Sequence, residues 1–425
     1  MDLISMDEPD IVTGLFYFGG RFQRLEVRIE NGKISAISRS ITHGNRLSLP
    51  GAIFPGGIDP HVHFRDPGET WKEDFRSGSI AAAYGGTTAV IDMPNNALPI
   101  DNYEAYSSKL GTVRYKSFID FGLASMFTGS NGDIIHKESS LIKTYLGNST
   151  NSAGVENIEE KQVAKLREFN VPKTYHLELG SCLDSHKMQE DSLHDHDNSR
   201  PKECEEAAFD QIGKIDLHPK VAAHVSHYFQ NMRNGFDFLE VTPHHLFLNS
   251  EMPLGAEGKV NPPLRGRKEQ MDLIDKFTSG AIDFVGSDHA PHSDEDKQEF
   301  NSAKSGIIGV ETRLPLIASL VSKKIISPEL FYRTCIFNPA KIHGMNKGEI
   351  ELGRDADFIS IDFNDPKRIN ENRLHSKRTV SPFNGFEAVF PSHVILRGRM
   401  VIDNFELIED RSGQYIPGSG KRENL

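Results

Sequence analysis

The central part of the chain alternates short apolar runs with charged segments, and this alternation limits the fold more than any other feature. The runs are strand-like, and the segments between them have helical character; the runs include TTAVIDMPN, IDFGLASMF, KTYHLEL, KVAAHVSH, DFLEVTPHH and AIDFVGSDHAP. This order is typical of parallel strands joined by helices. Its length predicts an α/β fold with a (β/α)8 barrel of the TIM type over residues 53–345.

The two ends of the chain have a different pattern from the middle. Residues 1–52 contain GLFYFGG, RLEVRIENGKISAIS and RLSLPGAIFP, and residues 346–425 contain GRDADFISIDF and HVILRGRMVIDNF. These runs alternate apolar and polar residues as strands do, and NGK is typical of a hairpin turn. Because chain termini often lie close together, we expect both ends to build one small β-sandwich domain.

Composition excludes several classes of partner and location. The formal net charge of -12 disfavours nucleic acid and anionic membranes, because both favour basic surfaces. No apolar run is long enough to span a bilayer, and the first residues lack a signal pattern. We therefore expect a soluble, cytoplasmic protein. The cysteines, Cys182, Cys204 and Cys335, are far apart without CxxC spacing, and we interpret them as free thiols in a reducing compartment.

The segment DPHVHFRDPG follows an apolar run and places His61, His63 and Arg65 two residues apart. Residues at this spacing point to one side of a strand, so both imidazoles would face the same way at the catalytic end of a barrel strand. Neutral imidazole is a good ligand for zinc. The alternative is a pair of hydrogen-bonded histidines at a strand end. The adjoining arginine and DPG favour a metal site.

Further candidate ligands follow other apolar runs: His176, His224 and Asp288. In a barrel, these strand ends would converge on one rim. Lys143 lies inside the apolar run of LIKTYLGNST, where burial would lower the pKa of its amine. A neutral amine can react with carbon dioxide and give a carbamate, an anionic ligand able to bridge two metals. The alternative is a lysine whose amine reaches solvent along its aliphatic chain.

The residues carry a resemblance to a known family. DPHVHFRDPG and GSDHAPH resemble the two signatures of the class I dihydroorotases of the amidohydrolase superfamily. Between them DMPNN, IKTYLGNST, HLE, RPKECEEAA, HVSH, VTPHHLFLN and KVNPPLR follow in the family's order, and GRDADFISID and SPFNG resemble its C-terminal segments. The likeness spans roughly residues 50–400.

The resemblance implies two zinc ions and a role for each site residue. One zinc would be held by His61, His63 and Asp288, the other by His176 and His224, with carboxylated Lys143 bridging them. Asp288 would also move protons. Arg65, Asn95 and His292 would hold a substrate carboxylate, and Asn261 would lie beside the substrate ring. Ala223 replaces a residue that belongs to an additional metal site in some relatives, so no third metal is expected.

The implied reaction is the reversible, zinc-dependent cyclisation of N-carbamoyl-L-aspartate to dihydroorotate, a step of pyrimidine biosynthesis. Arg65 favours this substrate, because a buried guanidinium would lack a partner on a neutral hydantoin or dihydropyrimidine ring. Otherwise Arg65 would pair with Asp66 or Glu69. Lys72, Glu73 and Asp74 are interpreted as a solvated helix start.

Two other functions remain open. One is a related cyclic amidohydrolase, such as an allantoinase or dihydropyrimidinase. The other is a catalytically silent homologue that acts as a scaffold for aspartate transcarbamoylase, which should lack metal ligands. Homo-oligomers or association with aspartate transcarbamoylase are also conceivable for an active enzyme of this family.

Overall fold

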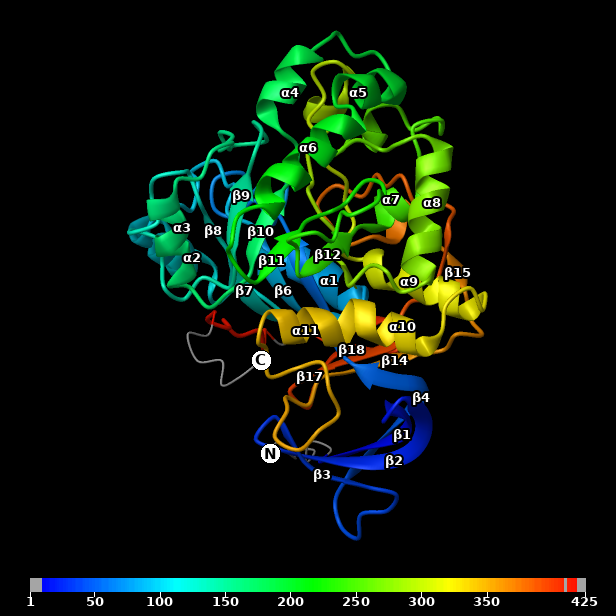
Figure 1. Cartoon of the computed structure of the whole chain (residues 1–425). Coiled ribbons are helices and arrows are strands. Elements are labelled where there is room, and N and C mark those ends of the chain that lie inside the picture. The colour runs from blue at the N-terminus through cyan, green and yellow to red at the C-terminus, as the bar shows by residue number, and fades with distance from the viewer. Residues whose placement is uncertain (1–9, 409–410, 419–425) are drawn as a thin grey trace.

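Buried parallel strands form the centre of the molecule, whose structure is a computed structural model describing residues 10–408 and 411–418 (Figure 1). One parallel sheet contains β5 (Gly57–Val62), β6 (Thr87–Asp92) and β7 (Asp120–Leu123). A second contains β8 (Ser125–Met126), β9 (Ile142–Tyr145), β10 (Lys173–His176), β11 (Lys220–Ala222), β12 (Phe238–Val241) and β13 (Phe284–Val285). Nearly every residue of these strands is buried, as expected where helices cover a parallel sheet.

The two parallel sheets adjoin each other at both edges. β7 and β8 are separated only by Ala124, whose N–H donates to the Asp92 carbonyl at 3.0 Å. At the other edge Val62 forms a parallel bridge with His289, the segment that follows β13. These contacts confirm a mixed α/β fold built on parallel strands. Closure into one continuous eight-stranded barrel stays a prediction.

Helices follow most of these strands and surround them in Figure 1. The longer ones are α1 (Phe75–Tyr84), α2 (Tyr103–Val113), α3 (Glu160–Arg167), α6 (Lys202–Gly213), α8 (Arg267–Thr278) and α9 (Arg313–Ser322). The shorter ones are α4 (Gly180–Ser185), α5 (Leu193–Ser199), α7 (Pro243–Phe247), α10 (Pro328–Tyr332) and α11 (Asn338–Ile342). Single turns lie at Gly255–Gly258, Glu295–Lys297, Arg333–Phe337 and Glu371–Arg373.

The start of α1 confirms one expectation and corrects another. Asp74 caps the helix, accepting the Ser77 N–H at 2.9 Å, so a helix does begin here. Lys72 and Glu73, however, are buried, and the expected solvated start is wrong. The Lys72 ammonium contacts Glu69 at 2.7 Å and Asp296 at 3.0 Å. A distant loop therefore covers a segment whose composition alone indicates exposure.

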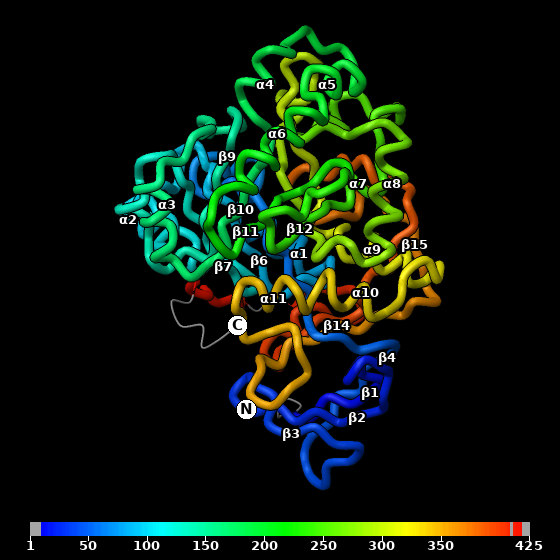
Figure 2. Tube along the Cα trace, in the orientation of Figure 1, coloured from blue at the N-terminus to red at the C-terminus, as the bar shows by residue number. Residues whose placement is uncertain are grey.

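Both chain ends contribute to one eight-stranded sheet, which lies beside the parallel strands in Figures 1 and 2. Its N-terminal strands are β1 (Ile11–Phe18), β2 (Arg21–Glu30), β3 (Lys33–Ser38) and β4 (Arg46–Pro55). Its C-terminal strands are β14 (Phe358–Ile361), β17 (His393–Leu396), β18 (Arg399–Asp403) and β19 (Glu406–Leu407). The ends meet where β4 pairs with β14 in antiparallel register. A small second sheet pairs β15 (Lys367–Arg368) with β16 (Glu387–Ala388).

The turn between β2 and β3 is the hairpin turn predicted from NGK. Asn31 and Gly32 have φ values of 53° and 76°, and two successive positive values are typical of a type I′ turn.

The pairing of the two chain ends in one sheet is confirmed by the contact between β4 and β14. The sandwich architecture and the boundaries after residues 52 and 345 stay predictions, and the first nine residues, where a signal pattern was excluded, lie outside the described part of the chain.

One apolar cluster joins the two parts of the molecule, because it contains Phe64 and Phe121 beside the parallel strands and Phe54 and Leu396 of the eight-stranded sheet. A second cluster fills the β-rich region around Phe16. Among the described residues, no helix is both long and apolar enough to cross a membrane.

Candidate active site

The two histidines of the HxH motif face one carboxylate. His61 lies within β5, and His63 follows that strand directly. Their Nε2 atoms lie 3.3 and 3.0 Å from Oδ1 of Asp288, which follows β13. The expected convergence of the first and last strands is therefore present. The ligand atoms of these three residues all lie within 4.8 Å of one another, close enough for one metal ion.

The Nδ1 atoms of these histidines bind other side chains, which orients the rings. His63 Nδ1 lies 2.7 Å from Oδ1 of Asn95, an oxygen that can only accept, so Nδ1 carries the proton. The lone pair of His63 Nε2 then faces Asp288. His61 Nδ1 contacts Oε1 of Glu240 at 2.7 Å. Burial lowers the pKa of His61 to about 3 and of His63 to about 4. Both rings are neutral at pH 7, as metal ligands must be.

Lys143 is a buried neighbour of His61. Its Nζ is buried and lies 3.4 Å from Nε2 of His61. Burial lowers the pKa of its amine to about 8. The alternative of an amine that reaches solvent is therefore wrong, because the residue is only 1% exposed. The same environment raises the pKa of the Glu240 carboxyl to about 8 through burial.

His176 and His224 stand next to this group at the ends of neighbouring strands. His176 closes β10, and His224 lies just beyond β11. Their ring centres are 4.6 Å apart, and the His224 ring is 5.2 Å from that of His61. Nδ1 of His224 is buried without a hydrogen-bond partner among the described residues. A buried polar atom without a partner is costly unless a ligand satisfies it.

The proposed carboxylate-binding residues lie on the other side of the same pocket. Arg65 is 3% exposed; its Nε donates to the Pro291 carbonyl at 3.3 Å, and its Nη2 lies 3.4 Å from Nε2 of His292. Its Nη1 has no hydrogen-bond partner among the described residues. Among the described residues, no salt bridge joins Arg65 to Asp66 or Glu69. Asp66 pairs with a lysine instead. A buried guanidinium with an unused donor favours an anionic ligand.

Asn95 and Asn261 have amide groups that are already in use. Besides accepting from His63, Asn95 donates its Nδ2 to the Thr150 carbonyl at 3.0 Å. Asn261 accepts from Ser305 at 3.1 Å and contacts Nε2 of His196 at 3.0 Å. Both residues border the pocket. Among the described residues both contacts of Asn261 use its oxygen, so its Nδ2 is the group that can donate to a substrate.

A small cavity of about 40 Å³ lies between these side chains. Most of the predicted residues line it, namely His61, His63, Arg65, Asn95, His176, His224, Asn261 and Asp288. Lys143 and His292 lie behind this lining and reach the site through His61 and Arg65. Ser149, Thr150, Asn261 and Ser305 also line a larger cavity of about 1320 Å³, so the small cavity opens into a wide cleft.

Three predicted residues have unusual backbone conformations. Arg65, His224 and Asp288 have φ values of 59°, 37° and 47°, in the left-handed region that residues with a side chain rarely adopt. Each such residue costs on the order of 1–3 kcal/mol, and such conformations cluster at functional sites. With these backbone conformations, the three side chains line the cavity at the points where their strands end.

The sequence interpretation missed two residues that the alternation of a strand would have indicated. Tyr145 lies two positions after Lys143 on β9 and lines the small cavity, with its ring 5.6 Å from that of His176. Glu178 lies two positions after His176 and contacts its Nε2 at 2.7 Å. Residues at this spacing share one side of an extended segment, so the positions of Lys143 and His176 could have indicated Tyr145 and Glu178.

The expectation of free cysteines is wrong for two of the three. Cys182 and Cys204 form a disulfide with a Cα–Cα distance of 5.4 Å, and Cys335 is free and buried. The two partners are 22 residues apart, and only the packing of α4 against α6 brings them together.

Comparisons with known proteins identify the family of the chain. The profile of the amidohydrolase family matches residues 52–401. A dihydroorotase of Thermoplasma acidophilum is 52% identical over 406 residues, covering 96% of this chain and 97% of that protein. A dihydroorotase of Methanosarcina acetivorans is 34% identical over 456 residues, covering 98% and 97%.

Solved structures give the same fold. The L-hydantoinase of Arthrobacter aurescens superimposes with a TM-score of 0.89 at 23% identity, covering 96% of this chain and 99% of that one. The dihydropyrimidinase of Brevibacillus agri gives 0.87 at 24%, covering 98% and 100%. At this identity the likeness is one of architecture. The family match over most of the chain and the relatives of nearly full length lead to one conclusion: the chain belongs to the amidohydrolase family and groups with its dihydroorotases.

Proposed function

We propose that this protein is a dihydroorotase, a hydrolase that catalyses the reversible cyclisation of N-carbamoyl-L-aspartate to dihydroorotate with release of water. The observation that carries the proposal is the unused Nη1 donor of buried Arg65 beside a cluster of metal-type ligands. The cluster supports amide hydrolysis, and the guanidinium supports a substrate with a carboxylate.

The donor set fits two zinc ions. His61, His63 and Asp288 would hold one ion, and His176 and His224 the other, with the lone Nδ1 of His224 supporting a ligand there. Lys143, carboxylated on its amine, would bridge the two. Its lowered pKa supports this modification, because only the neutral amine reacts with carbon dioxide. When bound, the ions would lower the pKa of water to about 7 and polarise the scissile carbonyl.

Asp288 is the proton carrier in this proposal. Its Oδ1 lies 3.3 and 3.0 Å from Nε2 of His61 and His63, so a cation held by these rings would keep the carboxylate ionised. An ionised carboxylate at this place can accept the proton of the attacking water. It then returns the proton to the ring nitrogen that leaves, and in the direction of ring closure it takes the proton from that nitrogen.

The substrate carboxylate would lie against Arg65, whose fork can donate two parallel bonds. His292 and Asn95 would complete this subsite, and Asn261 would lie beside the ring. Nε2 of His292 is 3.0 Å from the Ser305 carbonyl, which fixes its ring next to the guanidinium. A hydantoin or dihydropyrimidine would leave Arg65 unpaired, which weakens the alternative of a hydantoinase-like or allantoinase-like activity.

The finer architecture belongs to this proposal. We infer a closed (β/α)8 barrel over residues 53–345, and a β-sandwich domain from residues 1–52 and 346–425. The parallel strands with their edge bridge and the shared eight-stranded sheet support these assignments. A silent scaffold for aspartate transcarbamoylase is the weaker reading, since every proposed ligand is present.

The decisive experiment measures zinc content and turnover on one preparation. We expect about two zinc ions per chain, together with hydrolysis of dihydroorotate and cyclisation of carbamoyl aspartate. Hydantoin, dihydrouracil and allantoin serve as neutral-ring controls. Faster turnover of any neutral ring would reject the proposed substrate, and zinc without turnover of any substrate would favour the scaffold.

A further inference from the structure

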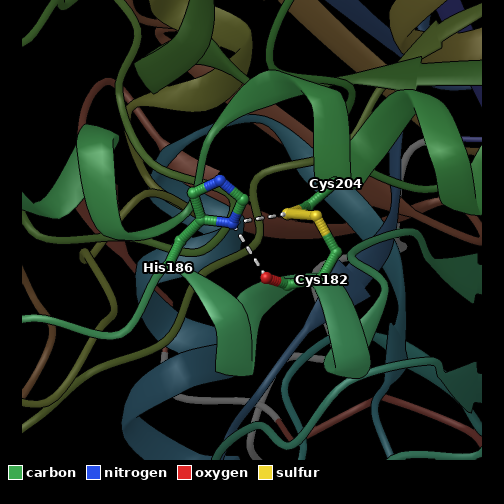
Figure 3. A group of neighbouring side chains, drawn as sticks. All are labelled: Cys182, His186 and Cys204. Carbon is green, nitrogen blue, oxygen red and sulfur yellow. Dashed lines mark hydrogen bonds between the residues drawn. A yellow bond between two sulfur atoms is a disulfide. The ribbon is translucent and has the colours of Figure 1, made fainter.

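A disulfide outside the catalytic cluster joins α4 to α6 (Figure 3). Cys182 lies in α4 and Cys204 near the start of α6, and His186 caps the C-terminal end of α4. Neither the proposed reaction nor its metal ligands require this bond. It therefore needs its own explanation.

The two sulfurs differ in accessibility. Cys182 is partly exposed, whereas Cys204 is 0% exposed. A thiol from solution therefore reaches the disulfide at Cys182, and Cys204 is the leaving group. Nδ1 of His186 lies 2.9 Å from the Cys182 carbonyl and 4.0 Å from Sγ of Cys204. Because a carbonyl only accepts, Nδ1 carries a proton, and it places this proton beside the departing sulfur.

Few contacts besides the disulfide hold α4 in place, and one of them is the bond that the Ser181 N–H donates to the Glu156 carboxylate. This helix has six residues and buries none of its side chains, and so short a helix is not stable by itself. Two other contacts tie the segment to α6 and its approach. The Leu179 N–H donates to the Cys204 carbonyl at 3.2 Å, and Glu178 forms a paired contact with Arg200 at 2.9 and 2.8 Å.

The same segment forms part of the cleft wall. Gly180, Leu183, Asp184 and Lys187 line the cavity of about 1320 Å³ that leads to the catalytic cluster. His176, a proposed metal ligand, precedes α4 by only a few residues. A change in the order of α4 therefore changes the wall that an approaching substrate meets.

We propose that Cys182 and Cys204 are a site of reversible thiol–disulfide exchange with low-molecular-weight thiols and disulfides, and that their bond fixes α4 as the wall of the cleft. In oxidation, the Cys182 thiolate attacks one sulfur of an external disulfide and releases one thiol. The Cys204 thiolate then attacks Cys182 in the mixed disulfide and releases the second. Two cysteine thiols are oxidised, one external disulfide is reduced to two thiols, and reduction runs the same steps backward.

Thiol counting tests the bond itself. The full chain is equilibrated in buffers of reduced and oxidised glutathione, denatured, alkylated and analysed by mass spectrometry. We expect one alkylated cysteine, Cys335, at the oxidising end and three at the reducing end. The Cys335→Ser variant should show no alkylated cysteine at the oxidising end and two at the reducing end. Three free thiols in every buffer, or one in every buffer, would overturn a reversible exchange.

Proteolysis tests the mechanical consequence. Lys187 is exposed just beyond α4 and offers a site for trypsin. Reduction of the wild type should speed cleavage there about fivefold or more, because a loosened segment is cut from its open state. Cys182→Ser should be cleaved at the fast rate with or without reductant, and Cys335→Ser should respond like the wild type. Equal rates in both states would reject the role of the bond in holding α4.

The rate of reduction tests His186. In His186→Asn, dithiothreitol should reduce the bond several-fold more slowly, while the final thiol count stays the same. His194→Asn makes the same change at an exposed histidine outside this contact and should keep the wild-type rate. A wild-type rate in His186→Asn would remove the histidine from the proposal. None of these readouts requires turnover, so their failure is distinct from a failure of the dihydroorotase assignment.

Discussion

The catalytic cluster and the wall of the cleft are held in different ways. The cluster sits at the ends of buried strands, where His61, His63 and Asp288 are fixed by backbone pairing and by hydrogen bonds to Glu240 and Asn95. The wall formed by α4 has no buried side chains and depends on a disulfide, one ion pair and a few backbone contacts. The residues proposed for catalysis, which need a fixed geometry, thus lie in the rigid part of the fold. The less firmly held α4 lies along the path by which a substrate would approach them.

The largest expected effect comes from removing the lysine that lies beside His61 in the rigid cluster. Lys143→Ala should lower kcat for dihydroorotate on the order of a thousandfold, since loss of a bridging ligand forfeits several kcal/mol of charge stabilisation. Steady-state assays with parallel zinc analysis measure this. Added short carboxylic acids should restore part of the activity, and a fully active variant would show that no bridge is needed.

Arg65 tests whether the cluster and its substrate contact are separable. Arg65→Ala should lower kcat/KM for dihydroorotate about a hundredfold, mostly through KM, because charge-assisted bonds are lost. Bound zinc should stay at the wild-type level. Arg65→Lys keeps the charge but lacks the planar guanidinium, so its kcat/KM should lie between that of the wild type and that of Arg65→Ala. Loss of zinc in Arg65→Ala would assign the residue to the metal site instead.

The pH dependence of carboxylation tests the environment of Lys143. Burial lowers its pKa from 10.5 to about 8, and only the neutral amine reacts. The neutral fraction is then about a tenth at pH 7 and most of the total at pH 9. Reactivation of decarboxylated enzyme at fixed dissolved carbon dioxide should therefore rise about tenfold and level off above pH 8. A rate that still climbs steeply at pH 10 would indicate an unshifted amine.

The smallest effect on activity is expected at the wall. Reduction, or Cys182→Ser, should raise KM about threefold with little change in kcat, because the cleft is altered and the metal ligands are not. The same change should lower the free energy of unfolding by about 3 kcal/mol, as expected for opening a loop of this length. Thermal unfolding with and without reductant measures the latter, with Cys335→Ser as control. A large loss of kcat would mean that wall and cluster are coupled.

Most of the cluster could be predicted because its residues follow a local rule. His61, His63, His176, His224 and Asp288 each end or follow an apolar strand, and parallel strands bring such ends to one rim. The exposed character predicted for Lys72 and Glu73 failed, since a loop more than two hundred residues away covers them. The left-handed backbone conformation of Arg65, His224 and Asp288 could not be predicted from the residue types, because tertiary packing holds these residues at positive φ.

The order of residues was enough to predict the α/β pattern, the β-rich ends, the Asn31–Gly32 turn and the residues that could serve as ligands. These features depend on alternation, turn chemistry and donor type, which are local properties. Three-dimensional packing was needed to show that Cys182 meets Cys204, that Glu178 and Tyr145 border the ligands, and that Arg65 keeps an unused donor. Contacts between distant segments depend on how helices and strands pack, and no short stretch of residues carries that information.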